Sequence, residues 1–248
     1  MTAGNLFYSN LSEHVAVTTD VERLLLKEYG SVFIARGGAA SPPKIVFTDQ
    51  SDVHSFQDRI AVKQALIGGL EMELQAAAMD ALLEAVAAAK AVGLSISPRG
   101  PDSARRDYNG SVELWGSRVD PALDHWVALG RLGETEAEQI RSLPPFEQVP
   151  VVLELESKGL WFAKDLSKSI IYSVAPPGTS QHLAMLAFDV REFGDERVRE
   201  ILARHQWFQT VVSDLPHFTF LGIEEAELTG LGLKKVESGE QAFWVPDI

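Results

Sequence analysis

Helical sequence patterns gather mainly before residue 160 of this chain, and short apolar runs typical of strands gather after it. A regular alternation of strands and helices would predict a parallel sheet, whereas this segregation is typical of the α+β class. No internal repeat or low-complexity linker divides the 248 residues. We therefore expect one main domain over residues 70–248, preceded by an N-terminal elaboration over residues 1–69 that contains helix and strand.

Capping residues and apolar spacing predict the helices. Thr19 and Glu22 match a capping box at the start of a helix that Gly30 ends. The alanine-rich stretch 70–92 has apolar residues at helical spacing and strong helix propensity, so we expect one long helix there. Further helices are expected over residues 108–119, 121–129, 134–143, 145–158 and 195–205.

Short apolar runs bounded by turn-forming residues predict the strands. A polar loop rich in Gly and Pro, residues 98–103, interrupts them and brings Arg106 near the start of a helix. The last two strands are joined through Ser238 and Gly239 and form a closing hairpin. Strands are expected over residues 31–35, 45–47, 94–97, 160–162, 170–172, 184–190, 218–221, 234–236 and 242–245.

Composition excludes several classes of function. The net charge of −13 argues against a nucleic-acid or anionic-membrane partner, because such binders cluster Lys and Arg. The absence of cysteine excludes disulfides, thiolate metal sites and Cys nucleophiles. No apolar run has the length of a membrane span, and the first residues lack the pattern of a secretory signal. The composition leaves the cellular location open.

His182, Asp189 and His217 are candidate metal ligands. A catalytic zinc commonly has three ligands drawn from His and Asp or Glu, and water fills the fourth position. The spacing of seven between His182 and Asp189 would put them on opposite faces of one strand, so His182 must precede the strand. Either histidine alone would more often be a hydrogen-bonded structural residue, but together with Asp189 they favour a metal site.

Three segments carry a family resemblance. Ser180-x-His182, followed by Ala187-x-Asp189, is similar to the Ser-x-His-x-x-Gly-x-Ala-x-Asp signature of the LAS zinc peptidases, with Met185 at the glycine position. This family contains D-alanyl-D-alanine carboxypeptidases and dipeptidases and shares its fold with Hedgehog signalling domains. The other two segments are Asp214-Leu-Pro-His217, which resembles Glu-x-Trp-His, and Ser103-Ala-Arg-Arg106-Asp-Tyr108, which resembles Ser-x-x-Arg-Ser-Tyr.

The resemblance implies an antiparallel Hedgehog/DD-peptidase-like sheet with flanking helices and zinc held by His182, Asp189 and His217. Asp214 would be the general base and Arg106 would stabilise the oxyanion of the tetrahedral intermediate, while Ser180 and Tyr108 would bind substrate. The implied substrates are short peptides with D-residues, such as peptidoglycan stems, and the implied location is periplasmic or extracellular.

Two alternatives follow from the departures from the family pattern. Asp214 is one methylene shorter than the family's Glu, and Pro216 replaces its Trp. These changes favour a non-catalytic module that keeps the fold and binds cell-wall peptides. A metal-free structural relative is the third reading. Both residues also have a purely structural alternative: Asp214 would accept N–H groups in a turn, and Arg106 would be solvated in the first turn of a helix or would pair with Asp102 or Asp107.

Overall fold

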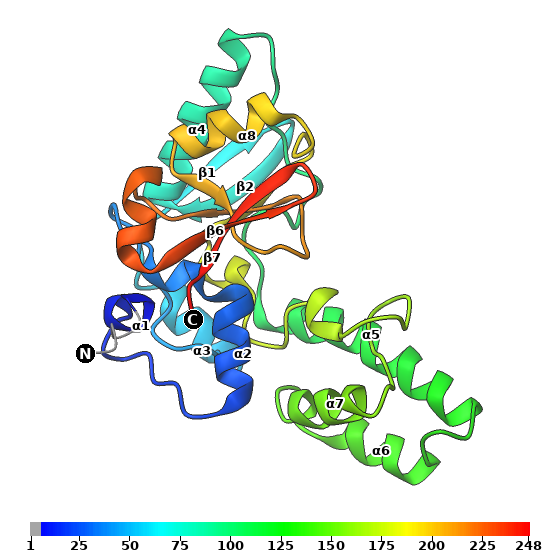
Figure 1. Ribbon diagram of the computed structural model, residues 1–248. Coiled ribbons are helices and arrows are strands. Elements are labelled where there is room, and N and C mark those ends of the chain that lie inside the picture. Colours follow the sequence, from blue (N-terminus) through cyan, green and yellow to red (C-terminus); the bar gives the residue numbers. More distant parts are fainter. Residues whose placement is uncertain (1–5) are drawn as a thin grey trace. The chain divides into compact units, whose positions relative to one another are not determined.

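The computed structural model describes residues 6–248, which form helices and three small antiparallel sheets (Figure 1). This confirms the α+β class expected from the sequence. The chain forms two compact units. The first contains the described residues up to Ile45, His54–Arg106 and Gln181–Ile248, and the second contains Val46–Val53 and Asp107–Ser180. Within residues 6–248, every helix is too short or too polar to cross a lipid bilayer.

A three-stranded antiparallel sheet with the order β3-β5-β4 lies at the centre of the first unit. Its strands are β3 (Ala187–Asp189), β4 (Trp207–Gln209) and β5 (His217–Phe220). The almost fully buried aromatic rings of Phe188, Trp207, Phe218 and Phe220 come from these strands. In the register of β3 and β5, Asp189 lies opposite His217, and directly opposed residues project from the same face.

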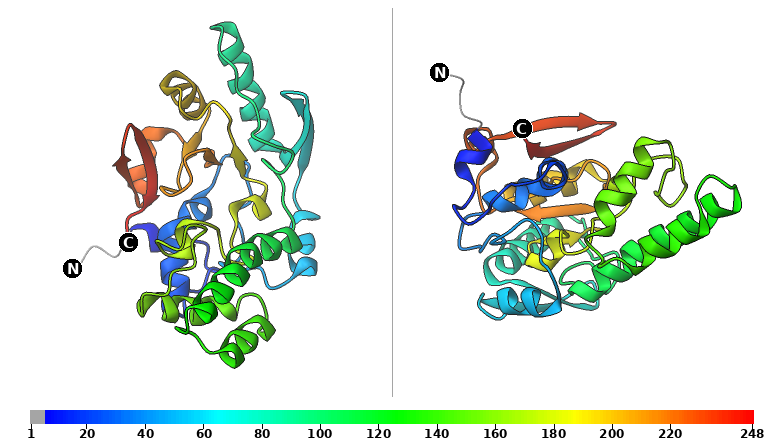
Figure 2. Two further views of the ribbon diagram at one scale, coloured as in Figure 1. Left: turned by 90° about the vertical axis from the view of Figure 1, so that its right-hand side faces the viewer. Right: turned by 90° about the horizontal axis from the view of Figure 1, so that it is seen from below.

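Two hairpins complete the strands of the first unit. The hairpin of β1 (Val62–Ile67) and β2 (Leu70–Gln75) lies on one side of the three-stranded sheet, and that of β6 (Leu233–Ser238) and β7 (Gln241–Pro246) lies on the other (Figure 2). The long helix α4 packs against α8, and α8 also packs against β4. The boundary between the two units falls within α3 (Gln50–Gln57). The helices that lie wholly in the first unit are α1 (Leu6–Asn10), α2 (Asp20–Tyr29), η1 (Gly30–Ile34), α4 (Ala76–Ala91), η3 (Gln181–Ala184), α8 (Glu196–Arg204) and η4 (Glu225–Leu231).

Predictions that rest on local end signals are confirmed. The Thr19 side chain accepts the N–H of Glu22, and the Glu22 carboxylate accepts the N–H of Thr19, so α2 begins with the expected capping box. Gly30 caps the same helix at its end. The helix expected near 195–205 is α8, with Asp195 at its N-cap, and the closing hairpin is β6–β7.

The single long helix expected over residues 70–92 is wrong. Residues Leu70–Gln75 form β2, and α4 begins only at Ala76. Glu71, Met72, Glu73 and Leu74 alternate between more exposed and buried side chains, which is the two-residue period of a strand. Gly68 and Gly69 both have positive φ, as the tight turn of a hairpin requires. The domain boundary expected after residue 69 therefore falls in the β1–β2 turn, inside the first unit.

Several expected strands are also wrong. The 3-10 helix η1 contains residues 31–34 of one expected strand, and η2 contains residues 170–172 of another. The chain is irregular over 45–47, 94–97 and 160–162. Every residue of η1 is buried, so its sequence carries no alternation that could separate strand from helix. The expected strand 184–190 is shortened to β3, and that at 218–221 corresponds to β5. Strands β1 and β4 were not expected.

The second unit is mainly helical. Its elements are α5 (Tyr108–Ala128), α6 (Glu134–Ser142), α7 (Gln148–Ser157) and η2 (Ile170–Tyr172). The two helices expected over 108–119 and 121–129 are the single helix α5, which continues through Pro121. Proline removes one backbone hydrogen bond, but the buried face of the helix runs on from Val119 to Leu123 and Trp126, so packing holds both halves in one helix.

Candidate metal centre

Three elements of the first unit bring the predicted ligands together. His182 lies in η3, Asp189 ends β3 and His217 begins β5. His182 thus precedes the strand, as its spacing from Asp189 required. Between η3 and β3, Met185 has a φ of 54°, in the left-handed region that favours glycine. This residue occupies the glycine position of the family signature.

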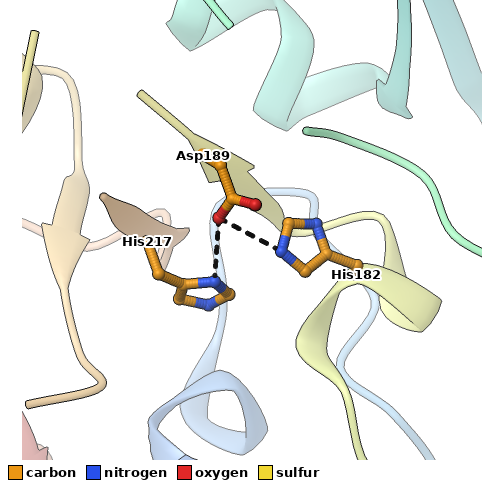
Figure 3. A group of neighbouring side chains, drawn as sticks. All are labelled: His182, Asp189 and His217. Carbon is orange, nitrogen blue, oxygen red and sulfur yellow. Dashed lines mark ion pairs between the residues drawn. The ribbon is translucent and has the colours of Figure 1, made fainter. Parts of the chain in front are cut away.

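The ligand atoms are arranged around one point (Figure 3). Asp189 Oδ1 lies 3.3 Å from His182 Nε2 and 3.3 Å from His217 Nδ1. All three atoms lie within 4.8 Å of one another, and both imidazoles are buried. Tetrahedral ligands with bonds of about 2.0 to 2.1 Å are separated by about 3.3 Å. The group could therefore hold a metal ion without a large rearrangement.

The hydrogen bonds of the outer ring nitrogens orient both imidazoles. His182 Nδ1 lies 2.7 Å from the carbonyl oxygen of Ala104, and His217 Nε2 lies 2.9 Å from Oε1 of Gln181. Both partners are oxygens that only accept, so the proton of each neutral ring belongs on the outer nitrogen. The inner nitrogens then present lone pairs towards Asp189. Ligating histidines in metal sites are oriented by the same kind of bond.

Lone pairs that converge in a buried site need a positive charge between them. His182 Nε2 and Asp189 Oδ1 are buried and have no hydrogen-bond partner among the residues described. A metal ion would satisfy all three acceptors, and so would a proton on one imidazole. Burial lowers the pKa of His182, although Asp189 opposes this effect, so the metal is the better match for this ring.

Asp189 is suited to act as an anionic ligand. Burial acts to raise the pKa of its carboxyl group, but the interactions with His182 and His217 outweigh this and lower the pKa below its ordinary value. Its second oxygen, Oδ2, accepts a hydrogen bond of 2.7 Å from Nη2 of Arg106. Only Oδ1 therefore remains available, which favours coordination through a single oxygen.

Arg106 is tied to the same cluster. Besides the bond to Asp189, its Nε donates to the carbonyl oxygen of Asp102 at 2.9 Å, and its backbone N–H donates to the carbonyl oxygen of His182 at 3.4 Å. The carboxylate of Asp102 is 4.0 Å from Nη2, so Asp189 is the closer ionic partner. In this arrangement the guanidinium pairs with a candidate metal ligand, and its role towards a substrate stays a prediction.

The remaining predicted site residues are not among the three clustered ligand candidates. Asp214 is exposed and forms part of a turn in which its carbonyl oxygen accepts the N–H of His217, so the bond involves its backbone and not its carboxylate. Ser180 is the last residue of the second unit and Tyr108 begins α5 in that unit. Burial raises the pKa of Tyr108, and Asp49 adds to this. The catalytic and substrate-binding roles of these three residues stay predictions.

Sequence reasoning missed Gln181 and the carbonyl oxygen of Ala104. Both hold a metal-ligand candidate from another segment of the chain: Gln181 is 36 positions from His217, and Ala104 is 78 positions from His182. No local pattern reports such pairings. The only sequence signal for Gln181 is its place inside the Ser180-x-His182 motif, where the motif allows any residue.

Comparisons with known proteins found no relative of this chain. The chain matches no protein-family model, no curated protein and no solved structure. The cluster of His182, Asp189 and His217 is therefore the observation from which function has to be inferred.

Proposed function

We propose that this protein is a zinc-dependent peptidase of the LAS type that hydrolyses short peptides containing D-residues, such as peptidoglycan stems. The observation that carries the proposal is the convergence of two buried imidazoles and one carboxylate, in which His182 Nε2 and Asp189 Oδ1 have no hydrogen-bond partner among the residues described. The choice of peptidase and of substrate rests on the three segments that resemble the family.

The donor set suits zinc. Two imidazoles and one carboxylate are a common ligand set of catalytic zinc, whereas Mg²⁺ and Ca²⁺ prefer oxygen ligands alone. Three protein ligands leave a position for water, which a bound zinc makes acidic enough to attack a carbonyl. His182 would bind through Nε2, His217 through Nδ1 and Asp189 through Oδ1.

Met185 supports the proposed Hedgehog/DD-peptidase-like arrangement. The family signature has glycine at this position, and here the backbone is in the left-handed conformation that glycine adopts at no steric cost. A buried methionine in this conformation is uncommon. The chain therefore keeps the turn that a glycine would favour while the residue itself has changed, as expected of a divergent member of the family.

Two side chains, Arg106 and Asp214, would carry out the catalytic steps that the metal does not. Arg106 lies beside Asp189 and carries the positive charge that the proposed mechanism directs at the developing oxyanion. Asp214 would take the proton of the attacking water. Its carboxylate is exposed and has no hydrogen bond or ion pair with the residues described, so no existing interaction opposes its rotation.

A second candidate function is a non-catalytic module that keeps the metal and binds cell-wall peptides. The position of Asp214 favours it, because the carboxylate is exposed and outside the group of ligand atoms. A general base has to come within about 2.6 to 3.2 Å of the proton that it removes. The bond between Arg106 and Asp189 favours this candidate as well, since it occupies the guanidinium.

Metal analysis followed by an activity assay tests both candidates. We expect purified protein to bind one zinc per chain, and we expect the zinc-loaded protein to release D-alanine from a D-Ala-D-Ala peptide. His217→Ala should abolish both, whereas His14→Ala, which alters an exposed histidine away from the cluster, should leave both intact. Zinc binding without turnover supports the binding module. Protein that binds no zinc contradicts both candidates.

A further inference from the structure

The imidazole of His217 belongs to a buried polar network whose other side chains are not metal-ligand candidates. His217 Nε2 and the hydroxyl of Thr219 both bond to Oε1 of Gln181, and the hydroxyls of Thr219 and Thr210 lie 2.6 Å apart. Nε2 of Gln181 donates to the carbonyl oxygen of Tyr29 at 2.8 Å and lies 3.4 Å from the Thr210 hydroxyl. Gln181, Thr210, His217 and Thr219 are all buried.

The number of protons on each side chain of this network determines which group donates in each hydrogen bond. The bond to the Tyr29 carbonyl identifies the nitrogen end of the Gln181 amide, so its oxygen faces His217. Thr219 has one hydroxyl proton, and it is used on this oxygen, so the proton between the two threonines must come from Thr210. The oxygen of Gln181 then accepts two bonds and has no proton to give. The only proton for the bond to His217 is the one on Nε2.

We propose that Gln181 is a positioning residue for the metal centre: oriented by Thr210 and Thr219, it holds His217 in the tautomer that presents Nδ1 to the ion. This inference rests on the proposed function for its metal. Gln181 also precedes His182 directly in η3, so one residue links two of the three ligands. Thr219 is two positions beyond His217 on β5, which places both side chains on the same face of the strand.

Gln181→Leu removes the acceptor and keeps a side chain of similar size. We expect apparent zinc affinity, measured at pH 7 by competition with a chromophoric chelator, to fall by about 10- to 100-fold, as for other residues that orient ligating histidines. Gln75→Leu is the matched control. Gln75 is equally buried, in the same unit, and bonds to Ala40 and Ala184 rather than to a ligand side chain. It should lower thermal stability while zinc affinity changes less than threefold.

Two less disruptive variants at Thr219 test the same inference if Gln181→Leu does not fold. Thr219→Val removes the hydroxyl at constant shape, and Thr219→Ser keeps it. We expect a several-fold loss of zinc affinity with valine and near wild-type affinity with serine. A purely structural role would instead lower the melting temperature of the metal-free variants and leave the zinc affinity of the folded protein unchanged.

The tautomer itself gives a readout that needs no metal. In metal-free wild-type protein, at a pH at which the His217 ring carries a single proton, ¹⁵N shifts should place that proton on Nε2, and folded Gln181→Leu should show a mixture of tautomers. A single proton on Nδ1 in the wild type overturns the inference, as does unchanged zinc affinity in folded Gln181→Leu and Thr219→Val. Absence of zinc binding by the wild type, with the Nε2 tautomer present, instead overturns the proposed function.

Discussion

At the scale of single residues, Arg106 has two possible roles that one substitution separates. Its guanidinium pairs with Asp189, and the proposed mechanism also assigns it the oxyanion. We expect Arg106→Gln to lower kcat on a D-Ala-D-Ala peptide by roughly 100-fold, because one well-aimed donor contributes about 3 kcal/mol in comparable sites. The zinc content should remain at one per chain, since Oδ1 of Asp189 stays available to the ion.

Arg105→Gln is the control for this substitution. Arg105 is the adjacent residue, is more exposed and pairs with Glu73 instead of a ligand candidate. Its kcat should stay within about twofold of the wild type, as expected for a surface ion pair. If Arg106→Gln keeps full activity, the guanidinium serves only to hold Asp189, and the oxyanion must be stabilised by another group.

The candidate ligands could be predicted from the sequence, whereas the residues that orient them could not. His182, Asp189 and His217 could be proposed because their residue types and order carry metal chemistry, and the structure does bring their ligand atoms together. Gln181 could not be proposed, because its role depends on a pairing between η3 and β5. The same reason hid the bond from Arg106 to Asp189, which spans 83 positions.

At the scale of elements, Glu156 of α7 organises the chain that follows it. Its Oε1 accepts the N–H groups of Phe162 at 3.2 Å and Ile170 at 2.7 Å, and its Oε2 accepts the hydroxyl of Ser169. We expect Glu156→Leu to destabilise the fold strongly in urea unfolding, since each buried N–H left unpaired costs about 1 to 3 kcal/mol. Glu156→Gln should be tolerated, because its amide oxygen can accept both N–H groups.

The pH dependence of unfolding checks the ionisation of Glu156. Burial raises its pKa above the usual 4.5, although its three hydrogen bonds oppose this. The folded state therefore holds this proton more tightly than the unfolded state, and the wild type loses stability relative to Glu156→Gln as pH rises above about 4.5. Glu154→Gln gives the opposite trend, because hydrogen bonding to Lys158 lowers the pKa of Glu154. A difference between wild type and Glu156→Gln that does not change with pH contradicts this assignment.

Elements with local end signals could be predicted, whereas the bounds of β3 and the existence of β4 could not. The capping box at Thr19 and the cap at Asp195 lie within a few residues of the helices that they begin. Strands β3 and β4 have three residues each, too few to show a period, and they exist because β5 pairs with both. The helix prediction fails over 70–75 because the helix propensity of the alanine-rich sequence that follows masks a short alternation.

At the scale of the whole molecule, all three ligand candidates belong to the first unit, so metal binding should stabilise that unit selectively. The ion would link η3 to a β3–β5 pairing of only three residue pairs. A ligand that binds only the folded state stabilises it by about 4 kcal/mol at a thousandfold excess over its Kd. In hydrogen exchange, we therefore expect zinc to slow exchange over residues 181–190 and 217–220.

Helices α5, α6 and α7 should exchange at the same rate with and without zinc, because they carry none of the three ligands. Asp189→Asn should remove the zinc effect, since it replaces the anionic ligand by a neutral amide. Magnesium in excess should have little effect on the wild type, because this ion prefers oxygen ligands. Equal protection of both units would point to zinc bound elsewhere on this acidic chain, and protection that survives in Asp189→Asn would remove the carboxylate from the site.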